Sequence, residues 1–338
     1  MSYPLIFVEV GRKVPRYFIR NVEYTRNRFG DIDIVLIFDD IEYRHRKKLQ
    51  SQNVILIHRD DLELSESTRA FNALEKSWSY RQRNFWQNTT SRFFYLYDAM
   101  QMLAVTAAIH AESDVILLSD KSLRFEDETN RQGLAYPMQN DLQGCASIFK
   151  VSKKVALEKF LIYILENWKR ENINDMDLLA EFSRTEYVHV LPTWPTLLAN
   201  QEQSFYDAGS LGRFFLGSDA RNHRIPFSFR GIEDRNKGSI FQEFQVQKSR
   251  WELRTSEFVS LRLEIDSNKY NLMNLHLHSK RLPKNIAELD SMLRKGFTHD
   301  RNVFWTLGHF DQVVFVERLI SSISRHILRS TSHPKDLR

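Results

Sequence analysis

Three short apolar runs in the first sixty positions constrain the fold of this chain more than any other feature. They cover residues 5–10, 32–38 and 53–58, and the second of them, IDIVLIF, is apolar almost without interruption. A strand with one face in water alternates apolar and polar residues, whereas a strand covered on both faces is continuously apolar. Helix-like segments separate the runs. The sequence therefore predicts an α/β fold with a mostly parallel central sheet.

The same alternation of strand-like and helix-like segments continues along the chain. Thr89 or Thr90 can cap a helix that runs to about residue 109, and its apolar residues lie almost all round, which predicts burial under the sheet. No repeat and no Gly- or Ser-rich linker forces a domain boundary. Later segments predict strands at residues 115–118, 144–150, 188–191 and 272–277 and helices at residues 155–168 and 175–182.

Composition and charge exclude several classes of protein. The 338 residues carry a net charge of +5 with no long basic tract, which argues against nucleic acid as a partner. Neither a dinucleotide-binding glycine motif nor a phosphate loop follows the first strand. The single cysteine, Cys145, excludes a disulfide framework and, in its apolar segment, is interpreted as a buried structural thiol. Without a secretory signal or a transmembrane segment, we expect a cytoplasmic protein.

Polar residues follow the apolar strands at the points where those strands end. Glu9 follows the first strand, Asp39 and Asp40 follow the second, and Arg59 and Asp60 follow the third. Ligands of open parallel sheets bind at the carboxyl ends of the strands. We therefore expect these side chains to lie at the binding site.

Two acids in the segment HAESD, Glu112 and Asp114, flank a serine just before the predicted strand at residues 115–118. In extended geometry their side chains point to the same side, so they can share one divalent cation. Such a cation can neutralise a diphosphate leaving group. The alternative is a solvated loop acid next to an acid that caps the strand end.

The segment NLHLHSK places four polar residues, from Asn274 to Lys280, on one face of a strand. The nitrogen of His276 or His278 beside carboxylates suits Mn²⁺ or a similar ion, and Lys280 can hold a phosphate as a point charge. The alternative is a pair of structural histidines whose hydrogen bonds are satisfied within the protein. Four polar side chains on an otherwise apolar segment nevertheless need a polar partner.

Further candidates come from a glycine-punctuated segment and from a helix start. Asp207 and Asp219 in the segment FYDAGSLGRFFLGSDARN are candidate general bases, and the alternative for each is an acid in a turn. Arg92 near the start of its helix is locally unfavourable and needs an anionic partner. A structural ion pair with Asp98 or Glu112 is the alternative to a ligand contact.

Taken in order, these segments resemble the nucleotide-sugar glycosyltransferases of the GT-A fold class. The pattern is a strand and helix (LIFVEVGRKVPRYFIRNVEY), a strand that ends in acids (IVLIFDD), a variant of the family's D-x-D motif that reads Glu112-Ser113-Asp114, and a later strand that leads into a helix (GCASIFKVSKKVALEKF). The resemblance implies a three-layer α/β fold with a mostly parallel central sheet, flanking helices and a C-terminal helical extension. It also implies a nucleotide-sugar-binding half at residues 1–120, an acceptor-side half at 121–309, and an amphipathic helix and tail at 310–338.

The activity that the resemblance implies is transfer of a sugar from a nucleoside diphosphate to an acceptor hydroxyl. A divalent metal, Mn²⁺ or Mg²⁺, would be held by Glu112 and Asp114 together with His276 or His278. Asp207, or else Asp219, would take the acceptor proton. The residues expected to bind the nucleotide and its diphosphate are Glu9, Asp39, Asp40, Arg92 and Lys280.

The stretch at residues 310–329 has an apolar stripe, and Arg318, Arg325 and Arg329 lie opposite it. One interpretation places this helix on an anionic membrane, where the enzyme would be peripheral on the inner face and would meet a lipid-linked glycan. The other packs the helix on the enzyme body. The partners that we expect are a nucleotide-sugar donor and a glycan or lipid-linked glycan acceptor, as in cell-surface or capsular polysaccharide synthesis.

Two other classes of protein remain open at this point. A metal-dependent hydrolase or phosphoesterase would use Asp114, His276 and His278 to hold a nucleophilic water, and would turn over generic phosphate esters. An inactive binding or scaffold protein would tolerate Asp114→Ala without loss of function.

Overall fold

The computed structural model of the chain describes residues 3–74, 80–170, 173–193, 204–209, 211, 249–255, 259–265, 268–277, 288 and 291. The chain divides into two compact units, Met1–Asp290 and Ser291–Arg338, and every helix and strand with described bounds belongs to the first. The predicted C-terminal helix lies outside the described residues. Among those residues, no helix is both long and apolar enough to cross a membrane.

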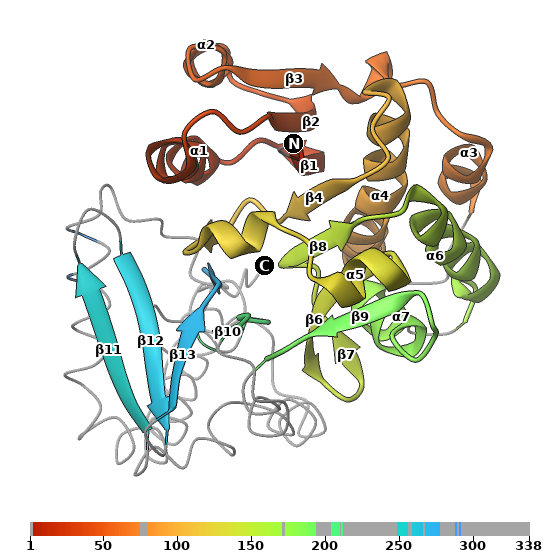
Figure 1. Ribbon diagram of the computed structural model, residues 1–338. Helices are drawn as coiled ribbons and strands as arrows, with labels where there is room; N and C mark the ends of the chain where they lie inside the picture. Colours follow the sequence, from red (N-terminus) through yellow and green to blue (C-terminus); the bar gives the residue numbers. More distant parts are fainter. Residues whose placement is uncertain are drawn as a thin grey trace, which may run out of the picture. The chain divides into compact units, whose positions relative to one another are not determined.

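A mostly parallel sheet forms the centre of the first unit (Figure 1). β8 runs antiparallel to both of its neighbours, and β7 is antiparallel to β6, whereas the remaining pairs are parallel. Across the sheet the strands are β3 (Val54–His58), β2 (Ile34–Asp40), β1 (Leu5–Lys13), β4 (Ala108–Ala111), β8 (Ile148–Val151), β6 (Leu134–Asn140) and β7 (Gln143–Gly144), and β9 (Val188–Leu191) pairs with β6.

The continuous apolarity of these strands has a direct structural cause. Along β2, Val35 and Ile37 pack into one hydrophobic core, whereas Ile34, Leu36 and Phe38 pack into a second core on the opposite face. Successive side chains of a strand point to opposite faces, so a strand between two cores needs an apolar residue at every position. The polar residues Asp39 and Asp40 come only at its carboxyl end.

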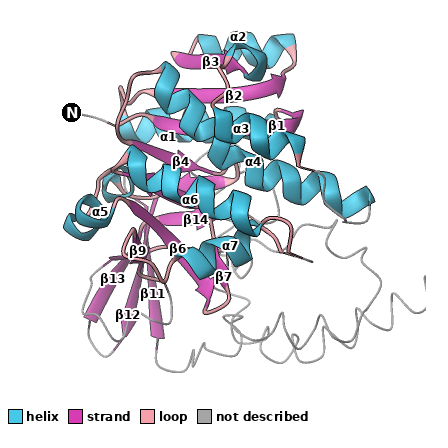
Figure 2. Ribbon diagram, turned by 90° about the vertical axis from the view of Figure 1, so that its right-hand side faces the viewer, coloured by secondary structure: helices cyan, strands magenta, loops and turns pink. Residues whose placement is uncertain are grey.

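Helices cover both faces of the sheet and complete a three-layer α/β fold (Figure 2). One core takes its helical residues from α1 (Arg16–Phe29) and α2 (Tyr43–Gln50). The other core takes them from α3 (Glu66–Ala73), α4 (Tyr80–Met102), α6 (Lys154–Asn167) and α7 (Asp175–Phe182). The remaining short elements are η1 (Arg59–Asp61), η2 (Asp120–Leu123) and α5 (Asp127–Gln132). The α/β class, the mostly parallel sheet and the flanking helices are thus confirmed.

The bounds of α4 differ from the sequence expectation at both ends. The helix already includes Tyr80, ahead of the threonines expected to cap it, and it ends at Met102 and not near residue 109. Ala104 adopts a positive φ of 52°, which takes the chain out of the helix. The residues that follow then form β4 because they pair with β1 and β8, and this pairing overrides the local helical pattern.

The predicted strand at residues 272–277 is divided between two sheets. β13 (Asn268–Leu272) belongs to a four-stranded sheet, in the order β10 (Ser204–Phe205), β13, β12 (Val259–Ile265) and β11 (Ser249–Thr255). β14 (Asn274–His276) instead pairs antiparallel with β5 (Val115–Leu117), with His276 opposite Val115. This pairing brings His276 to the segment that carries Glu112 and Asp114.

Candidate active site

Glu112 and Asp114 lie in a tight turn between β4 and β5. The backbone N–H of Val115 donates to the carbonyl of Glu112 at 3.0 Å, so the motif is a turn and not the extended segment that the sequence predicted. Asn21 of α1 is fully buried, and its Nδ2 donates to the carbonyls of Ser113 at 2.9 Å and Val115 at 2.8 Å. One amide therefore holds the turn on both sides of Asp114.

His276 lies against both acids of this turn. Its Nε2 is 3.1 Å from Oε2 of Glu112 and 3.4 Å from Oδ1 of Asp114. Burial alone would lower the pKa of His276, but the two carboxylates raise that pKa well above its ordinary value. The structure thus brings together two acids and one histidine that are far apart in the sequence.

Arg92 lies in the interior of α4, and not near its start as expected, between the partly buried Glu112 and the buried Asp175. Its guanidinium pairs through Nη1 with Glu112 and through Nη2 with Asp175, the first residue of α7. Burial would raise the pKa of Glu112, but Arg92 and His276 hold it below its ordinary value. Burial raises the pKa of Asp175 in spite of the same arginine. Of the two structural partners considered for Arg92, the described structure pairs it with Glu112, and Asp98 instead accepts from the backbone N–H of Ser65 at 3.0 Å.

The donor atoms around His276 fit a divalent cation. Carboxylate oxygens of Glu112 and Asp114 and an imidazole nitrogen are ligands that Mn²⁺ and similar ions accept. The carboxylates of the buried Asp114 and Asp175 and of the partly buried Glu112 exceed the positive charge of Arg92, so additional positive charge is favourable here. In the metal-free chain the imidazole of His276 carries it, since its pKa is raised.

Asp207 is hydrogen-bonded to the backbone of His276. Its Oδ2 accepts from the backbone N–H of His276 at 2.9 Å, and its Oδ1 accepts from the N–H of Gly209 at 2.7 Å and of Leu211 at 3.0 Å. Its own N–H donates to Oδ1 of the buried Asn274 at 2.9 Å. Burial raises the pKa of Asp207, and the backbone donors oppose this shift. The described contacts therefore tie the carboxylate to the backbone around β14.

A second buried cation, Lys150, organises the chain that leads to Asp207. Its fully buried Nζ donates to Oε1 of Glu126 at 2.6 Å, to Oη of Tyr206 at 2.8 Å and to the carbonyl of Arg124 at 2.6 Å. The Tyr206 hydroxyl also donates to Oε1 of Glu126 at 2.8 Å. Burial lowers the pKa of Lys150 in spite of the ion pair. This cluster fixes the residue that directly precedes Asp207.

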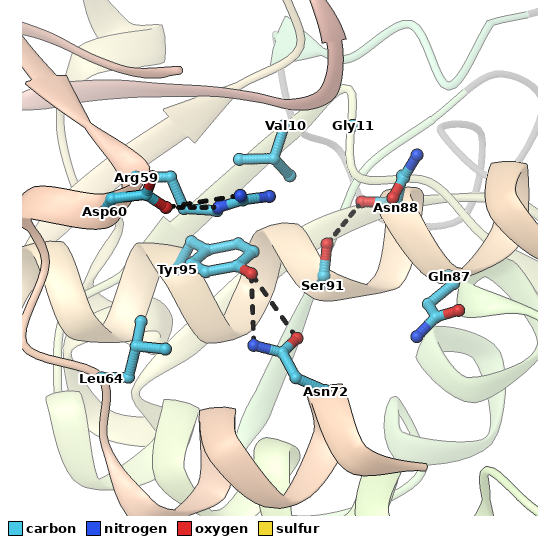
Figure 3. Close-up of a pocket in the computed structure, with 10 residues that line it drawn as sticks. All are labelled: Val10, Gly11, Arg59, Asp60, Leu64, Asn72, Gln87, Asn88, Ser91 and Tyr95. Atoms are coloured by element: carbon cyan, nitrogen blue, oxygen red, sulfur yellow. Dashed lines mark hydrogen bonds and ion pairs between the residues drawn. The ribbon is translucent and has the colours of Figure 1, made fainter. Parts of the chain in front are cut away.

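A cavity of about 490 Å³ opens near the carboxyl ends of β1 and β3, and Figure 3 shows its lining. Tyr95 of α4 and Asn72 of α3 are hydrogen-bonded across it at 3.3 Å. Gly11 has a φ of +74°, and a Cβ at this position would come within 1.9 Å of the Asn88 side chain, so only glycine fits. The lining residues are Val10, Gly11, Arg59, Asp60, Leu64, Asn72, Gln87, Asn88, Ser91 and Tyr95.

The acids expected at the ends of β1 and β2 have different surroundings. Oδ2 of Asp39 accepts from the N–H of Gly11 at 2.6 Å and from Nη1 of Arg59 at 3.1 Å, so Asp39 holds two residues that line the cavity. Glu9 is buried and forms a two-pronged ion pair with Arg12, at 2.8 and 3.1 Å. Asp40 is exposed. Asp219, His278 and Lys280 lie outside the described residues.

Three residues that contact this site, Asn21, Asp175 and Cys145, were not assigned to it from the sequence. Asn21 and Asp175 are paired with groups more than 80 positions away, and their local context indicates only an ordinary helix interior and a helix start. Cys145 is buried, as expected, but its Sγ lies 4.0 Å from Nδ1 of His276. A single cysteine in an apolar segment gives no signal of that contact.

Comparisons with known proteins return similarity in structure alone. No model of a known protein family matches the chain. No curated protein sequence matches it either.

Among solved structures, the chain is similar to several glycosyltransferases, the class of protein that the sequence resembles. The galactosyltransferase LgtC in complex with donor and acceptor sugar analogues is 11% identical over 58% of this chain and 77% of that chain, with a TM-score of 0.38. Mouse xyloside xylosyltransferase 1 is 11% identical over 57% and 85%, with a TM-score of 0.38. The bifunctional glycosyltransferase WbbM is 13% identical over 70% and 45%, with a TM-score of 0.41. All three identities are below 25% and all three TM-scores are below 0.5.

Replacing Arg92 by Met should destabilise the protein by about 3–5 kcal/mol, because Glu112 and Asp175 then remain buried without their shared cation. Asp175→Asn should lower the free energy of unfolding of the wild-type chain. In the Arg92→Met background the same substitution should lower it clearly less, or even raise it. Urea unfolding of the two single variants and the double variant measures this coupling, which is about 0.5–3 kcal/mol for residues in contact.

Arg124→Met is the matched control, because Arg124 and its partner Asp120 are both exposed, and its cost should stay within about 0.5 kcal/mol. Equal effects of Asp175→Asn in the two backgrounds would show that Arg92 and Asp175 are not coupled.

Acid should weaken the Lys150 cluster through Glu126. Partial burial would raise the pKa of Glu126, but Lys150 and Tyr206 hold it below its ordinary value of 4.5. A carboxyl whose pKa is lowered by folding stabilises the protein above its ordinary pKa, and this contribution is lost as the pH falls through the lowered value. Glu126→Gln should therefore cost stability at pH 7 and cost much less well below pH 4.5.

Urea unfolding of wild type and variant at both pH values measures the difference. Glu128→Gln, which removes an exposed acid from α5, is the control and should give a small effect at either pH. A cost of Glu126→Gln that stays constant between the two pH values would contradict the assignment.

Proposed function

We propose that this protein is a glycosyltransferase that moves a sugar from a nucleoside diphosphate to an acceptor hydroxyl with the help of a divalent cation. The observation that carries the proposal is the meeting of Glu112, Asp114 and His276 beside the first unit's central sheet. The same stretch of α4 carries Ser91, which lines the cavity, and Arg92, which pairs with Glu112. Two adjacent residues of α4 therefore contact the ligand-sized cavity and the proposed cation site, respectively.

Glu112, Asp114 and His276 would hold the cation, Mn²⁺ or Mg²⁺. When bound, the ion would supply positive charge to the departing diphosphate, the largest developing charge of this reaction. Arg92 keeps Glu112 ionised, since it holds the pKa of that carboxyl low. Asn21 fixes the turn that carries Asp114. The proton on His276 would leave when the ion binds, because a histidine ligand is neutral.

The cavity beside Gly11 is the proposed site of the nucleoside. Its volume of about 490 Å³ lies in the range of small-molecule sites. Asp39 positions Arg59 at its edge, and amide groups of Asn72, Gln87 and Asn88 offer donors and acceptors to a base or ribose. Glu9 and Asp40 stay candidates for nucleotide contact, and in this proposal Glu9 acts through Arg12, whose guanidinium it orients.

Asp207 serves this site as a positioning residue. Its carboxylate accepts from three backbone amides, one of them the amide of His276, and so sets where the imidazole stands. Of the two acids that the sequence offered as proton acceptor, this leaves Asp219 as the candidate for the acceptor proton. Lys280 and His278 stay candidates for the diphosphate and the cation.

In this proposal the donor side and the acceptor side of the site come from successive halves of the chain. All residues that line the cavity and both acids of the turn fall within residues 1–120, which supports that half as the donor side. The acceptor, a glycan or lipid-linked glycan of cell-surface or capsular polysaccharide synthesis, is proposed from the sequence alone. The arginine-rich face at residues 310–329 would bind an anionic membrane and so bring a cytoplasmic enzyme to a lipid-linked acceptor at the inner face of the membrane.

Nucleoside diphosphates and nucleotide sugars should raise the melting temperature of the protein, and only when Mn²⁺ or Mg²⁺ is present. A ligand at about 100 times its Kd stabilises the folded state by about 2.7 kcal/mol, which a thermal-shift assay detects. Asp114→Ala and His276→Ala should each abolish this metal-dependent shift and the transfer of sugar.

Asp120→Ala, which removes an exposed acid close to the site in sequence, is the control and should keep both. Absence of a shift with every nucleotide would contradict the proposal. Hydrolysis of generic phosphate esters by the wild type, lost in the same two variants, would instead identify a metal-dependent hydrolase.

A further inference from the structure

Cys145 lies beside His276, on the side from which its sulfur also approaches Glu112 of the acid turn. The side chain is buried, and its backbone N–H donates to the carbonyl of Pro137 at 2.9 Å. Its Sγ faces Nδ1 of His276 at 4.0 Å, whereas Nε2 of the same imidazole faces Glu112 and Asp114. The imidazole therefore contacts a thiol and two carboxylates, and the thiol sulfur also lies within 4.8 Å of a Glu112 oxygen.

Two overlapping sets of metal donors result from this arrangement. Glu112, Asp114 and His276 form the set used in the proposed transfer reaction. Glu112, Cys145 and His276 form a second set, in which one ligand atom from each residue lies within 4.8 Å of the others. In a tetrahedral site with bonds of about 2.0–2.3 Å the ligand atoms lie about 3.3–3.6 Å apart, so the second set needs its side chains to close by about 1 Å.

The two sets differ in the ion that they prefer. Oxygen-rich sites suit Mg²⁺ and Mn²⁺, whereas a thiolate beside an imidazole suits Zn²⁺ and Co²⁺. Both sets need Glu112 and His276, so they cannot be complete at the same time. An ion that binds the sulfur therefore takes two of the three ligands that the transfer site needs.

We propose that Cys145, His276 and Glu112 form a second cation site that takes a thiophilic divalent ion such as Zn²⁺, and that this ion excludes Mn²⁺ from the transfer site. The inference rests on the proposed function for the inhibitory consequence only. On binding, metal–sulfur and metal–nitrogen bonds would form, the S–H bond of Cys145 and one N–H bond of the protonated His276 would break, and both protons would pass to solvent. Zn²⁺ thereby switches the enzyme off through a cysteine that transfer itself does not use.

Cobalt(II) reports the sulfur ligand directly, because a cobalt–thiolate bond gives an intense charge-transfer band in the near ultraviolet. The chain has one cysteine, so such a band can come only from Cys145. Titration of the full-length, metal-free protein with Co²⁺ should give the band, and Zn²⁺ should remove it. Cys145→Ser keeps the size of the side chain and should lose the band and lower the affinity for Zn²⁺ about tenfold or more.

Manganese binding, followed by the loss of the free Mn²⁺ signal in electron paramagnetic resonance, separates the two sites. Cys145→Ser and Cys145→Ala should both bind Mn²⁺ as the wild type does, and both should melt near the wild-type temperature. Zn²⁺ should compete with Mn²⁺ in the wild type and much less in either variant.

Co²⁺ binding without the charge-transfer band, or unchanged Zn²⁺ affinity in Cys145→Ser, would overturn the second site and leave the Mn²⁺ site standing. A charge-transfer band without any Mn²⁺ binding would keep the thiophilic site and overturn the metal role in the proposed function. These outcomes distinguish failure of the one proposal from failure of the other.

Discussion

The guanidinium of Arg92 is inserted between the carboxylates of Glu112 and Asp175, and this buried ion-pair cluster holds together parts of the chain that are far apart in sequence. It joins α4 to the turn after β4 and to the start of α7. Without a cation, placing these two carboxylates close together would cost free energy, because burial removes the water that would otherwise stabilise their charge. The position of Glu112, and with it the geometry offered to a divalent ion, therefore depends on this one arginine.

The rest of the site is positioned from the backbone outward. Asn21 holds the acid turn by its carbonyls, Asp207 holds β14 by the N–H of His276, and Lys150 holds the segment ahead of Asp207. Each of these three side chains is buried and hydrogen-bonded to main chain or to a neighbouring side chain. Preorganisation of this kind places charged groups before a ligand arrives, so binding energy is not spent on moving them.

The sequence predicted the fold well because its strongest signal has a simple physical origin. A strand between two cores must be apolar at every position, and residues 34–38 of β2 are all apolar. The end of α4 was missed because strand pairing at residues 108–111 overrides a helical pattern that extends past it. The pairing of Arg92 with Asp175 and the contact of Cys145 with His276 join residues 83 and 131 positions apart, and no local pattern encodes them. The resemblance grouped Glu112 and Asp114 with His276 or His278, and the structure brings Glu112, Asp114 and His276 together, whereas His278 lies outside the described residues.

We propose that Glu112, Asp114 and His276 hold a divalent ion, that this ion binds the diphosphate, and that the nucleoside lies in the cavity beside Gly11. Anomalous diffraction from crystals grown with Mn²⁺ and a nucleoside diphosphate tests it most directly, because the ion's position is measured independently of any assay. We expect a manganese peak in contact with His276 and at least one acid of the turn, with the diphosphate on the ion and the nucleoside in the cavity. Manganese or nucleotide bound elsewhere, with Arg92, Glu112 and His276 still in their present contacts, would contradict it.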